Sequence, residues 1–376
     1  MISVEVLQGR AAVESLADEW DVLVGNSFTA SFGQSAWYLA WLDAFPYRNI
    51  AVITARQGGR LVGLLPLARV RTDVRGLYFT NLSPIARGNY EAPIVQPDLA
   101  AEVLPAMLDA AIRHFGRYVT LAWPNIPVTD PSLGVLRSWF ASRGMPFVEE
   151  NEVAPRLRLN GRTFEEVEQD WTSSHRKDVR RQRKRLASEK GPVSLWFPSS
   201  IEEAEPVLTE FFKVHDEKWL SQGFPGMFTP QLQRHFRAIL HRLWDHGFHF
   251  STVRCGGTDV SYLIGFFAGG WLQYYRPSYR PEFGVYSPSK IHLGLIVEEA
   301  CRQKWTGVDF LLGGYPYKYA WANETMEVTS VLAGGHKWTP SYLWFTRGKP
   351  WAKQRFTGLY NRAKMYLQKT PRKDDF

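Results

Sequence analysis

The sequence predicts an α/β (α+β) fold in which one unit occurs twice in tandem, each copy a mixed sheet flanked by helices. The segment Thr54–Val62 matches Thr252–Val260 at a constant offset of 198 residues (252 − 54). Each segment has the pattern of a strand, a Gly-Gly turn and a second strand. Long amphipathic helical patterns, at 32–45 and 230–246, end just before the two hairpins. A chain of 376 residues also exceeds one ordinary core and fits about two domains.

The element order of the second copy is β-α-α-β-β-β-α-β-α-β. Its elements are a strand at 193–197, a helix at 201–220, a helix with Thr229 as N-cap and Pro230 at its first position, the hairpin, a strand at 271–275, a helix at 288–304, a strand with Asp309, a turn with Lys318 and a strand at 326–332. The same order fits the first copy, with a strand at 3–7, two helices up to 45, the hairpin at 50–67, strands at 77–82 and 118–123, and helices at 102–115 and from 131. We therefore expect a first copy at 1–160, a basic helical linker at 161–192, a second copy at 193–345 and a basic amphipathic tail at 346–376.

The formal net charge of +8 is concentrated in two segments. Residues 175–190 hold eight Lys and Arg against two acidic residues, and residues 347–376 hold nine against two, so the local charges are +6 and +7. The rest of the chain then carries about −5 (8 − 13). Any attraction to nucleic acid or to an anionic membrane therefore belongs to the basic helix or to the tail.

Cysteine content and the N-terminus indicate a cytoplasmic protein. Cys255 and Cys301 lack the spacing of a disulfide framework or a zinc site, which favours a reducing compartment. The segment Met1–Val6 is not a basic stretch followed by an apolar one, so it does not predict a secretory signal. The uncharged stretch 260–275 contains three glycines and is too short for a membrane span.

The segment Gly307–Trp321 carries the clearest candidate for chemistry. A short apolar run with Asp309 predicts a buried strand, two glycines allow a sharp turn, and Tyr317-Lys318 then open a short helix. Ligands usually bind at strand ends in α/β folds, so Lys318 could stabilise a developing negative charge there. The alternative is a surface lysine among packing aromatic residues.

The element order and four segments together resemble the GCN5-related acyltransferase (GNAT) fold in its duplicated, Fem-like form. Within this superfamily the resemblance is specifically to the cellulose-biosynthesis-associated (CelD/BcsL-type) acetyltransferases. The resemblance covers roughly residues 32–324 and includes FGQSAWYLAW at 32–41, the basic segment with Arg176, Arg180 and Arg181, HDEKW at 215–219, and the run 309–321. It implies an N-acyltransferase that moves an acyl group from acyl-CoA or acyl carrier protein, used as co-substrate without a tightly bound cofactor, to an amine of an envelope- or exopolysaccharide-related acceptor. Hydroxyl acylation is a less favoured outcome.

The resemblance implies a reaction centre in the second copy. Fem-type transferases have an aromatic-lysine pair at the place of Tyr317-Lys318, so Lys318 is expected to stabilise the tetrahedral oxyanion, with Asp309 on the strand before it. His215 lies on the helix that faces the acceptor in simple acyltransferases and could take a proton from the amine; a core histidine is the alternative. The histidines at 235, 241, 246 and 249 are irregularly spaced, and we predict no metal site.

The loop before the helix at 288 departs from the glycine-rich pyrophosphate loop of simple acetyl-CoA enzymes. The helix N-terminus with Ser287, Ser289 and Lys290 could still bind a phosphate, and Arg276 could add charge. A capped helix start explains Ser287-Pro288 without any ligand.

The first copy has no lysine at the corresponding turn, after Trp123, and is expected to recognise the acceptor instead. Related transferases place the acceptor between the two copies. The predicted wall residues are Gln34, Trp37, Tyr90, Glu91 and Tyr275, although Trp37 fits a core position as well.

The basic segments leave two questions open. The helix at 175–190 is either a solvated connector or a clamp for an anionic donor such as a carrier protein, CoA or tRNA. The tail is compatible with peripheral contact at the inner membrane face or with docking on the protein body. An aminoacyl-tRNA-dependent ligase and a non-catalytic scaffold protein therefore remain alternative functions, and DNA is not an expected partner.

Overall fold

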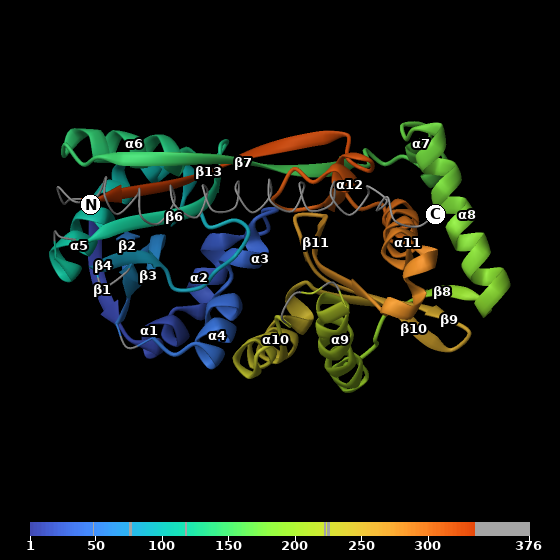
Figure 1. Cartoon of the computed structure of the whole chain (residues 1–376). Helices are drawn as coiled ribbons and strands as arrows, with labels where there is room; N and C mark the ends of the chain where they lie inside the picture. Colours follow the sequence, from blue (N-terminus) through green and yellow to red (C-terminus); the bar gives the residue numbers. More distant parts are fainter. Residues whose placement is uncertain (48, 75–76, 117–118, 222, 224–225, 335–376) are drawn as a thin grey trace, which may run out of the picture.

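The computed structural model describes residues 1–334 except 48, 75–76, 117–118, 222 and 224–225 (Figure 1). The predicted tail at 346–376 lies outside the described residues. One sheet runs through the described chain in the order β1-β2-β3-β4-β6-β13-β7-β12-β11-β10-β9-β8, with the short β5 paired to β3.

The strands belong to the two halves of the sequence. Those of the first half are β1 (Ile2–Gln8), β2 (Ile50–Gln57), β3 (Arg60–Val74), β4 (Leu77–Pro84), β5 (Ile94–Val95), β6 (Thr120–Pro127) and β7 (Phe147–Arg158). Those of the second half are β8 (Val193–Trp196), β9 (Phe248–Cys255), β10 (Thr258–Ala268), β11 (Trp271–Tyr279), β12 (Gly307–Asp309) and β13 (Glu324–Gly334).

The helices follow the predicted repeat. The first half contains α1 (Arg10–Ser15), α2 (Ala17–Val24), α3 (Ala30–Gly33), α4 (Ser35–Ala44), α5 (Ala100–Phe115), α6 (Pro131–Ser142) and α7 (Phe164–Gln169). The connecting helix is α8 (Ser173–Lys190), and the second half adds α9 (Ile201–Ser221), α10 (Pro230–Leu243), α11 (Pro288–Arg302) and α12 (Pro316–Tyr319). The described residues also form three short 3-10 helices, η1 (Pro97–Leu99), η2 (Trp244–His246) and η3 (Pro281–Tyr286).

The duplicated hairpin is confirmed in detail. Gly58 and Gly59 have φ of 58° and 84°, and Gly256 and Gly257 have φ of 55° and 84°. Positive φ at both turn positions matches the twist of the flanking strands, which is why each copy uses Gly-Gly there. The predicted N-cap is confirmed too, because the Thr229 side chain accepts a hydrogen bond from a backbone N–H in the first turn of α10.

The helix predicted at 32–45 is broken, which corrects the sequence interpretation. The chain forms α3 and then α4, with Gln34 between them in an extended conformation (φ −64°, ψ 147°). Helix α3 buries Phe32 and α4 buries Trp37 and Tyr38, so tertiary packing rather than one continuous amphipathic face sets their positions.

The two copies exchange strands, a feature that the sequence did not predict (Figure 1). The end of β7, from the first half, pairs with β12 of the second half, Asp309 opposite Arg156. Strand β13, from the second half, lies between β6 and β7, with Val331 opposite Trp123 on β6. Each copy therefore completes its sheet with a strand of the other.

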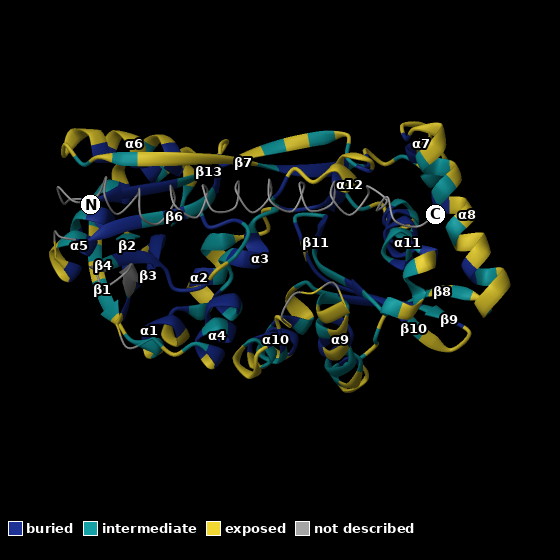
Figure 2. Cartoon of the chain, in the orientation of Figure 1, coloured by how far each residue is buried: buried dark blue, intermediate teal, exposed yellow. Residues whose placement is uncertain are grey.

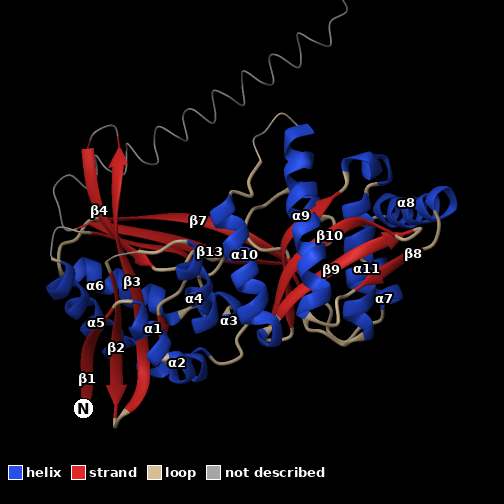
Figure 3. Cartoon of the chain, turned by 90° about the horizontal axis from the view of Figure 1, so that it is seen from below, coloured by secondary structure: helices blue, strands red, loops and turns tan. Residues whose placement is uncertain are grey.

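On one face of the sheet the two copies share a single hydrophobic core. On the other face each copy has its own. A single core on the first face packs α1 to α4 against α9 and α10, and includes Trp37 of the first half beside Phe266 of the second. Helices α4 and α10 lie side by side there (Figure 3). On the other face, α5 and α6 cover one core and α7, α8 and α11 cover two more. The exchanged strands contribute to the foreign cores through Val331 and Leu157, each burial worth about 1.5–3 kcal/mol.

Candidate active site

The candidate active site lies where two parallel strands of the second copy separate. Strand β12 pairs with β11 only from Gly307 to Asp309, opposite Trp271 to Gln273. Strand β11 continues to Tyr279 along β10 on its other side. The carboxyl end of a parallel pair is a common ligand position in α/β folds. The Lys318 segment follows β12 at this end.

Lys318 is buried, so the interpretation as a surface lysine is wrong. It is 4% exposed, although its neighbours Tyr315, Tyr317 and Tyr319 are about half exposed. Its Nζ donates hydrogen bonds to the carbonyl oxygens of Leu311 at 3.0 Å and Leu312 at 2.5 Å. An ammonium group has three N–H donors, so these two bonds leave one donor for a substrate atom.

Burial also changes the acidity of this ammonium group. It lowers the pKa of Lys318 to about 8, because a charged amine is poorly solvated in the protein interior. The negative charges of Asp309 and Glu152 oppose this shift. Near neutral pH the ammonium form still dominates, which is the form that can stabilise an oxyanion.

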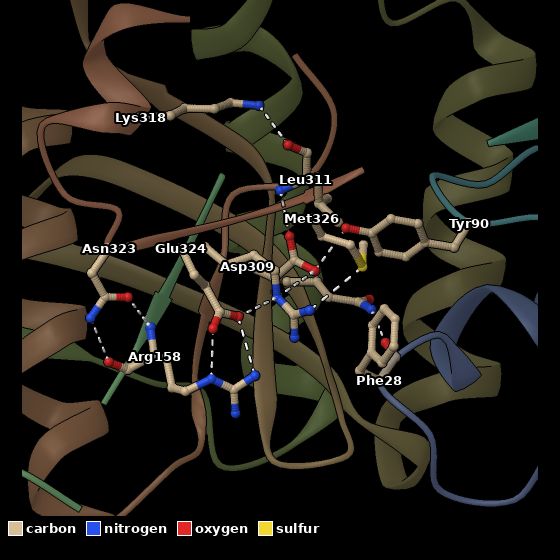
Figure 4. A network of polar contacts seen from close by, with 11 residues as sticks. Phe28, Tyr90, Arg158, Asp309, Leu311, Lys318, Asn323, Glu324 and Met326 are labelled. Atoms are coloured by element: carbon tan, nitrogen blue, oxygen red, sulfur yellow. Dashed lines mark hydrogen bonds and ion pairs between the residues drawn. The ribbon is translucent and has the colours of Figure 1, made fainter. Parts of the chain in front are cut away.

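Asp309 is fully buried, and neighbouring groups engage both oxygens of its carboxyl group (Figure 4). Tyr90 donates its hydroxyl to Oδ2 at 2.8 Å, and the Leu311 backbone N–H donates to Oδ1 at 2.8 Å. The Arg156 Nε lies 3.9 Å from Oδ2. Burial raises the pKa of Asp309, and Arg156 is the main opposing influence. A carboxylate engaged in this way is better suited to hold neighbouring groups than to accept a substrate proton.

This cluster joins two residues that the sequence analysis placed in different roles. Tyr90 was expected to touch the acceptor, and its hydroxyl instead bonds the strand that precedes Lys318. Arg156, the third side chain of the cluster, was not predicted from the sequence. Its guanidinium carbon lies 3.7 Å from the Trp271 ring centroid and 4.8 Å from that of Phe28. The alternating pattern Ala154–Leu159 was the available signal for a strand at this position.

His215 occupies a core position and is not placed to act as a base. Its Nε2 accepts a hydrogen bond from the Trp219 indole N–H at 3.1 Å, which puts the proton of the neutral ring on Nδ1. Burial lowers the pKa of His215 to about 4, although Asp216 opposes this shift. The ring lone pair is therefore already used at neutral pH, and we do not assign His215 a catalytic role.

The four predicted donor-binding residues differ in whether their polar atoms are free to bind a phosphate. The Arg276 Nε and the Ser289 hydroxyl are buried and have no hydrogen-bond partner in the described part of the chain. Lys290 instead forms an ion pair with Asp178 of α8 at 2.5 Å. Ser287 has a left-handed backbone (φ 54°), and its carbonyl accepts the amides of the first turn of α11. Arg276 and Ser289 are thus the better candidates for a phosphate.

The predicted acceptor residues of the seam are largely buried. Trp37 is fully buried and packs edge-on against Phe266 and Tyr275, as a core residue does. The buried Gln34 Oε1 has no hydrogen-bond partner among the described residues. Tyr275 belongs to the same aromatic cluster.

Glu91 of the first copy also has a buried carboxyl group, as Asp309 of the second copy does. Its Oε1 accepts the Gly88 N–H at 2.6 Å, and burial raises its pKa to about 8. It is therefore mostly protonated near neutral pH. Glu91 directly follows Tyr90 and bonds the backbone of Gly88 on the other side of it, so the segment 88–91 links an uncharged buried acid to the Asp309 cluster.

Tyr90 also lines a groove in the first copy with a volume of about 310 Å³. The groove is lined by β5 and by the ends of α2 and β6, and its other lining residues are mostly aliphatic residues and prolines, with a few hydroxyl groups and the Asp130 carboxyl group. Phe28 lines it as well and stands edge-on to Tyr90, with ring centroids 5.7 Å apart. The groove therefore reaches the residue that bonds Asp309.

The basic helix α8 is docked on the second copy, with its outer side exposed (Figure 2). Val179 and Leu186 are buried along its inner side. Several of its basic residues form ion pairs within the protein, among them Arg180 with Glu168, Arg183 with Glu298 and Arg185 with Glu189. These pairs reduce the charge that the helix presents to an anionic partner.

The described residues contain no group of three or more His, Cys, Asp or Glu side chains arranged to hold a metal ion. None of the described helices has the length and hydrophobicity needed to cross a membrane.

Comparison with known proteins identifies the fold. Residues 173–319, from α8 to α12, match the family model described as an acetyltransferase (GNAT) domain. No curated protein matches the chain. The chain is similar to the structure of FemX, with a TM-score of 0.57 at 14% identity, covering 86% of this chain and 96% of that one. It is also similar to the C-terminal domain of a putative lysylphosphatidylglycerol synthetase from Agrobacterium fabrum, with a TM-score of 0.54 at 11% identity, covering 86% and 92%.

A third similar structure is a protein of unknown function from Bacteroides thetaiotaomicron, with a TM-score of 0.56 at 12% identity, covering 89% and 100%. Together with the repeated hairpins and sheet order, these findings show a tandem duplication of the GNAT fold, with the match to the acetyltransferase (GNAT) domain at residues 173–319. The cellulose-biosynthesis-associated type stays a prediction.

Proposed function

We propose that the chain is a Fem-like N-acyltransferase with one reaction centre, in the second copy, and that the first copy recognises the acceptor. The observation that carries the proposal is the buried ammonium of Lys318, fixed by two carbonyl oxygens near the point where β11 and β12 separate. The match of residues 173–319 to a GNAT acetyltransferase domain supports the same location.

The chemistry is aminolysis of a thioester. The amine nitrogen attacks the acyl carbon, the C–N bond forms and the C–S bond breaks, and the proton lost by the amine ends on the departing thiolate, which becomes the free thiol. The tetrahedral intermediate carries an oxyanion, which the third N–H of Lys318 can stabilise. A preorganised donor of this kind typically contributes about 10²- to 10³-fold in kcat.

The donor is an acyl-CoA or an acyl carrier protein, with Arg276 and Ser289 as the phosphate-binding residues. The acceptor is an amine of an envelope- or polysaccharide-related molecule that lies in the groove beside Tyr90. Tyr90 supports this position for the acceptor, because it both lines the groove and donates a hydrogen bond to Asp309. The ion pairs of α8 argue against a tRNA clamp as its main role.

Donor choice is the first experiment. Thermal shifts are compared for acetyl-CoA, longer acyl-CoAs, acyl carrier protein and charged tRNA, because a bound donor stabilises the fold by mass action. A shift with the thioesters is expected. A salt-sensitive shift with tRNA alone would support the aminoacyl-tRNA-dependent ligase, and no shift with any donor would favour a scaffold protein.

Turnover of the Lys318→Met variant with the identified donor then tests the reaction centre. We expect kcat to fall about 10²- to 10³-fold with little change in donor affinity, since the oxyanion exists only in the transition state. Lys213→Met, which removes a largely exposed lysine of α9, is the matched control and should keep turnover. Near-full turnover of the Lys318 variant would refute the assignment.

A further inference from the structure

A continuous chain of contacts runs from the first copy to the ammonium of Lys318. It begins at Tyr90, whose hydroxyl donates to Asp309 Oδ2 at 2.8 Å. It continues from Asp309 Oδ1, which accepts the Leu311 N–H at 2.8 Å. It ends at the Leu311 carbonyl, which accepts from Lys318 Nζ at 3.0 Å. Every member of the chain is at most 5% exposed.

Leu311 is the strained member of this chain. Its φ is 59°, in the left-handed region that a branched, non-glycine side chain rarely adopts. Strain of this kind persists only when surrounding contacts hold it. The bond from the Leu311 N–H to Asp309 is such a contact, and the buried Leu311 side chain packs in the core that both copies share. The strained backbone sets the direction of the carbonyl that Lys318 uses.

A second residue of the first half keeps Asp309 in place. The Arg156 guanidinium lies against the Trp271 ring, and its Nε is 3.9 Å from Asp309 Oδ2. Arg156 is on the exchanged strand β7, opposite Asp309 in the sheet. Tyr90 and Arg156 both come from the first half of the sequence, so the second copy does not build this support alone.

We infer that Tyr90 of the first copy is a positioning residue for Lys318, acting through Asp309 and the strained Leu311 backbone. Its importance for catalysis rests on the proposed function. The link also connects the groove in the first copy with Lys318, because a ligand in that groove would touch the ring of Tyr90.

The test combines kinetics with a direct observation of the lysine. In protein labelled with ¹³C and ¹⁵N at lysine, the Lys318 Nζ signal is the one missing from Lys318→Met. Tyr90→Phe removes the hydroxyl, and Asp309→Asn removes the charge but keeps the size. Tyr262→Phe is the control, since it removes another buried phenol whose hydroxyl bonds the Asp259 carbonyl at 3.2 Å.

We expect Tyr90→Phe to move the Lys318 signal and to lower kcat about 10-fold or more with little change in KM, because misplacing a reacting group is costly even without lost contacts. Asp309→Asn should lower the pH at which Lys318 titrates, since it removes an attractive charge. The double variant should lose less activity than the product of the two single losses. Tyr262→Phe should leave the Lys318 signal unchanged.

An unchanged Lys318 signal and kcat in Tyr90→Phe would overturn the inference, even if Asp309→Asn failed to fold. Fully multiplicative losses in the double variant would overturn it too. A shifted Lys318 titration together with full turnover of Lys318→Met would keep the positioning link and refute the proposed catalytic role of the lysine.

Discussion

Replacing Glu91 by glutamine should make the protein more stable than the wild type at high pH, and leave its stability unchanged at low pH. Burial raises the pKa of Glu91 from 4.5 to about 8, and the bond from the Gly88 N–H only partly opposes this. The folded state therefore holds the proton more tightly than the unfolded state. The resulting stability is fully present below pH 4.5 and is lost as the pH rises through about 8.

The magnitude follows from the width of this pH window. Each pH unit between the two pKa values changes the free energy of unfolding by ~1.4 kcal/mol. The window from 4.5 to about 8 then corresponds to roughly 4–5 kcal/mol for Glu91. Glutamine keeps a carbonyl oxygen for the Gly88 N–H but does not ionise. The variant should match the wild type near the low end of the window and exceed its stability increasingly toward the high end.

Urea unfolding of both proteins between about pH 5 and about pH 9 measures this difference directly. Glu102→Gln, which removes an exposed carboxylate at the start of α5, is the control and should show a small, nearly pH-independent difference. A stability difference for Glu91→Gln that stays flat with pH would refute the burial argument, and a difference that falls with pH would reverse its sign.

Three further outcomes follow from the same structure. Turnover should decline as the pH rises through about 8, where Lys318 loses its proton, and a rate that rises across this pH would contradict the oxyanion role. Gly307→Ala should lower the free energy of unfolding by about 3 kcal/mol, because the added Cβ would lie 2.2 Å from a β7 carbonyl oxygen and 2.6 Å from the Trp271 ring. Thermal melts measure this loss, and the control Gly134→Ala, which has open space around it, should be neutral or slightly stabilising. Arg276→Ala should weaken donor binding and reduce its salt dependence in titration calorimetry, and an unchanged affinity for every donor would move the phosphate site elsewhere.

Local chemistry made the repeat predictable from the sequence. The Gly-Gly turns, the N-cap at Thr229 and the strand with Asp309 all depend on neighbouring residues, and each is found where it was expected. The position of Lys318 after a strand end was predictable for the same reason. Its burial was not, because that depends on two carbonyl oxygens that turn toward it only in the folded chain.

The strand exchange could not be predicted in this way. Strand β7 begins with a mostly polar, exposed run, which gives no periodic signal for a sheet interior, and only its end at 154–157 is buried. Its partners lie at least 149 residues away in sequence (307 − 158), and such pairings follow from the whole fold. The bond between Tyr90 and Asp309 depends on the same arrangement, so the sequence placed each residue near the site without showing that they touch.

The position of the bound donor tests the central claim most directly. A crystal structure is needed with a hydrolysis-resistant analogue of whichever thioester raises the melting temperature. A single reaction centre in the second copy predicts the acyl oxygen within about 3 Å of Lys318 Nζ, between β11 and the turn after β12. A donor bound in the first copy instead, between the ends of β4 and β6 near Pro127, would contradict it.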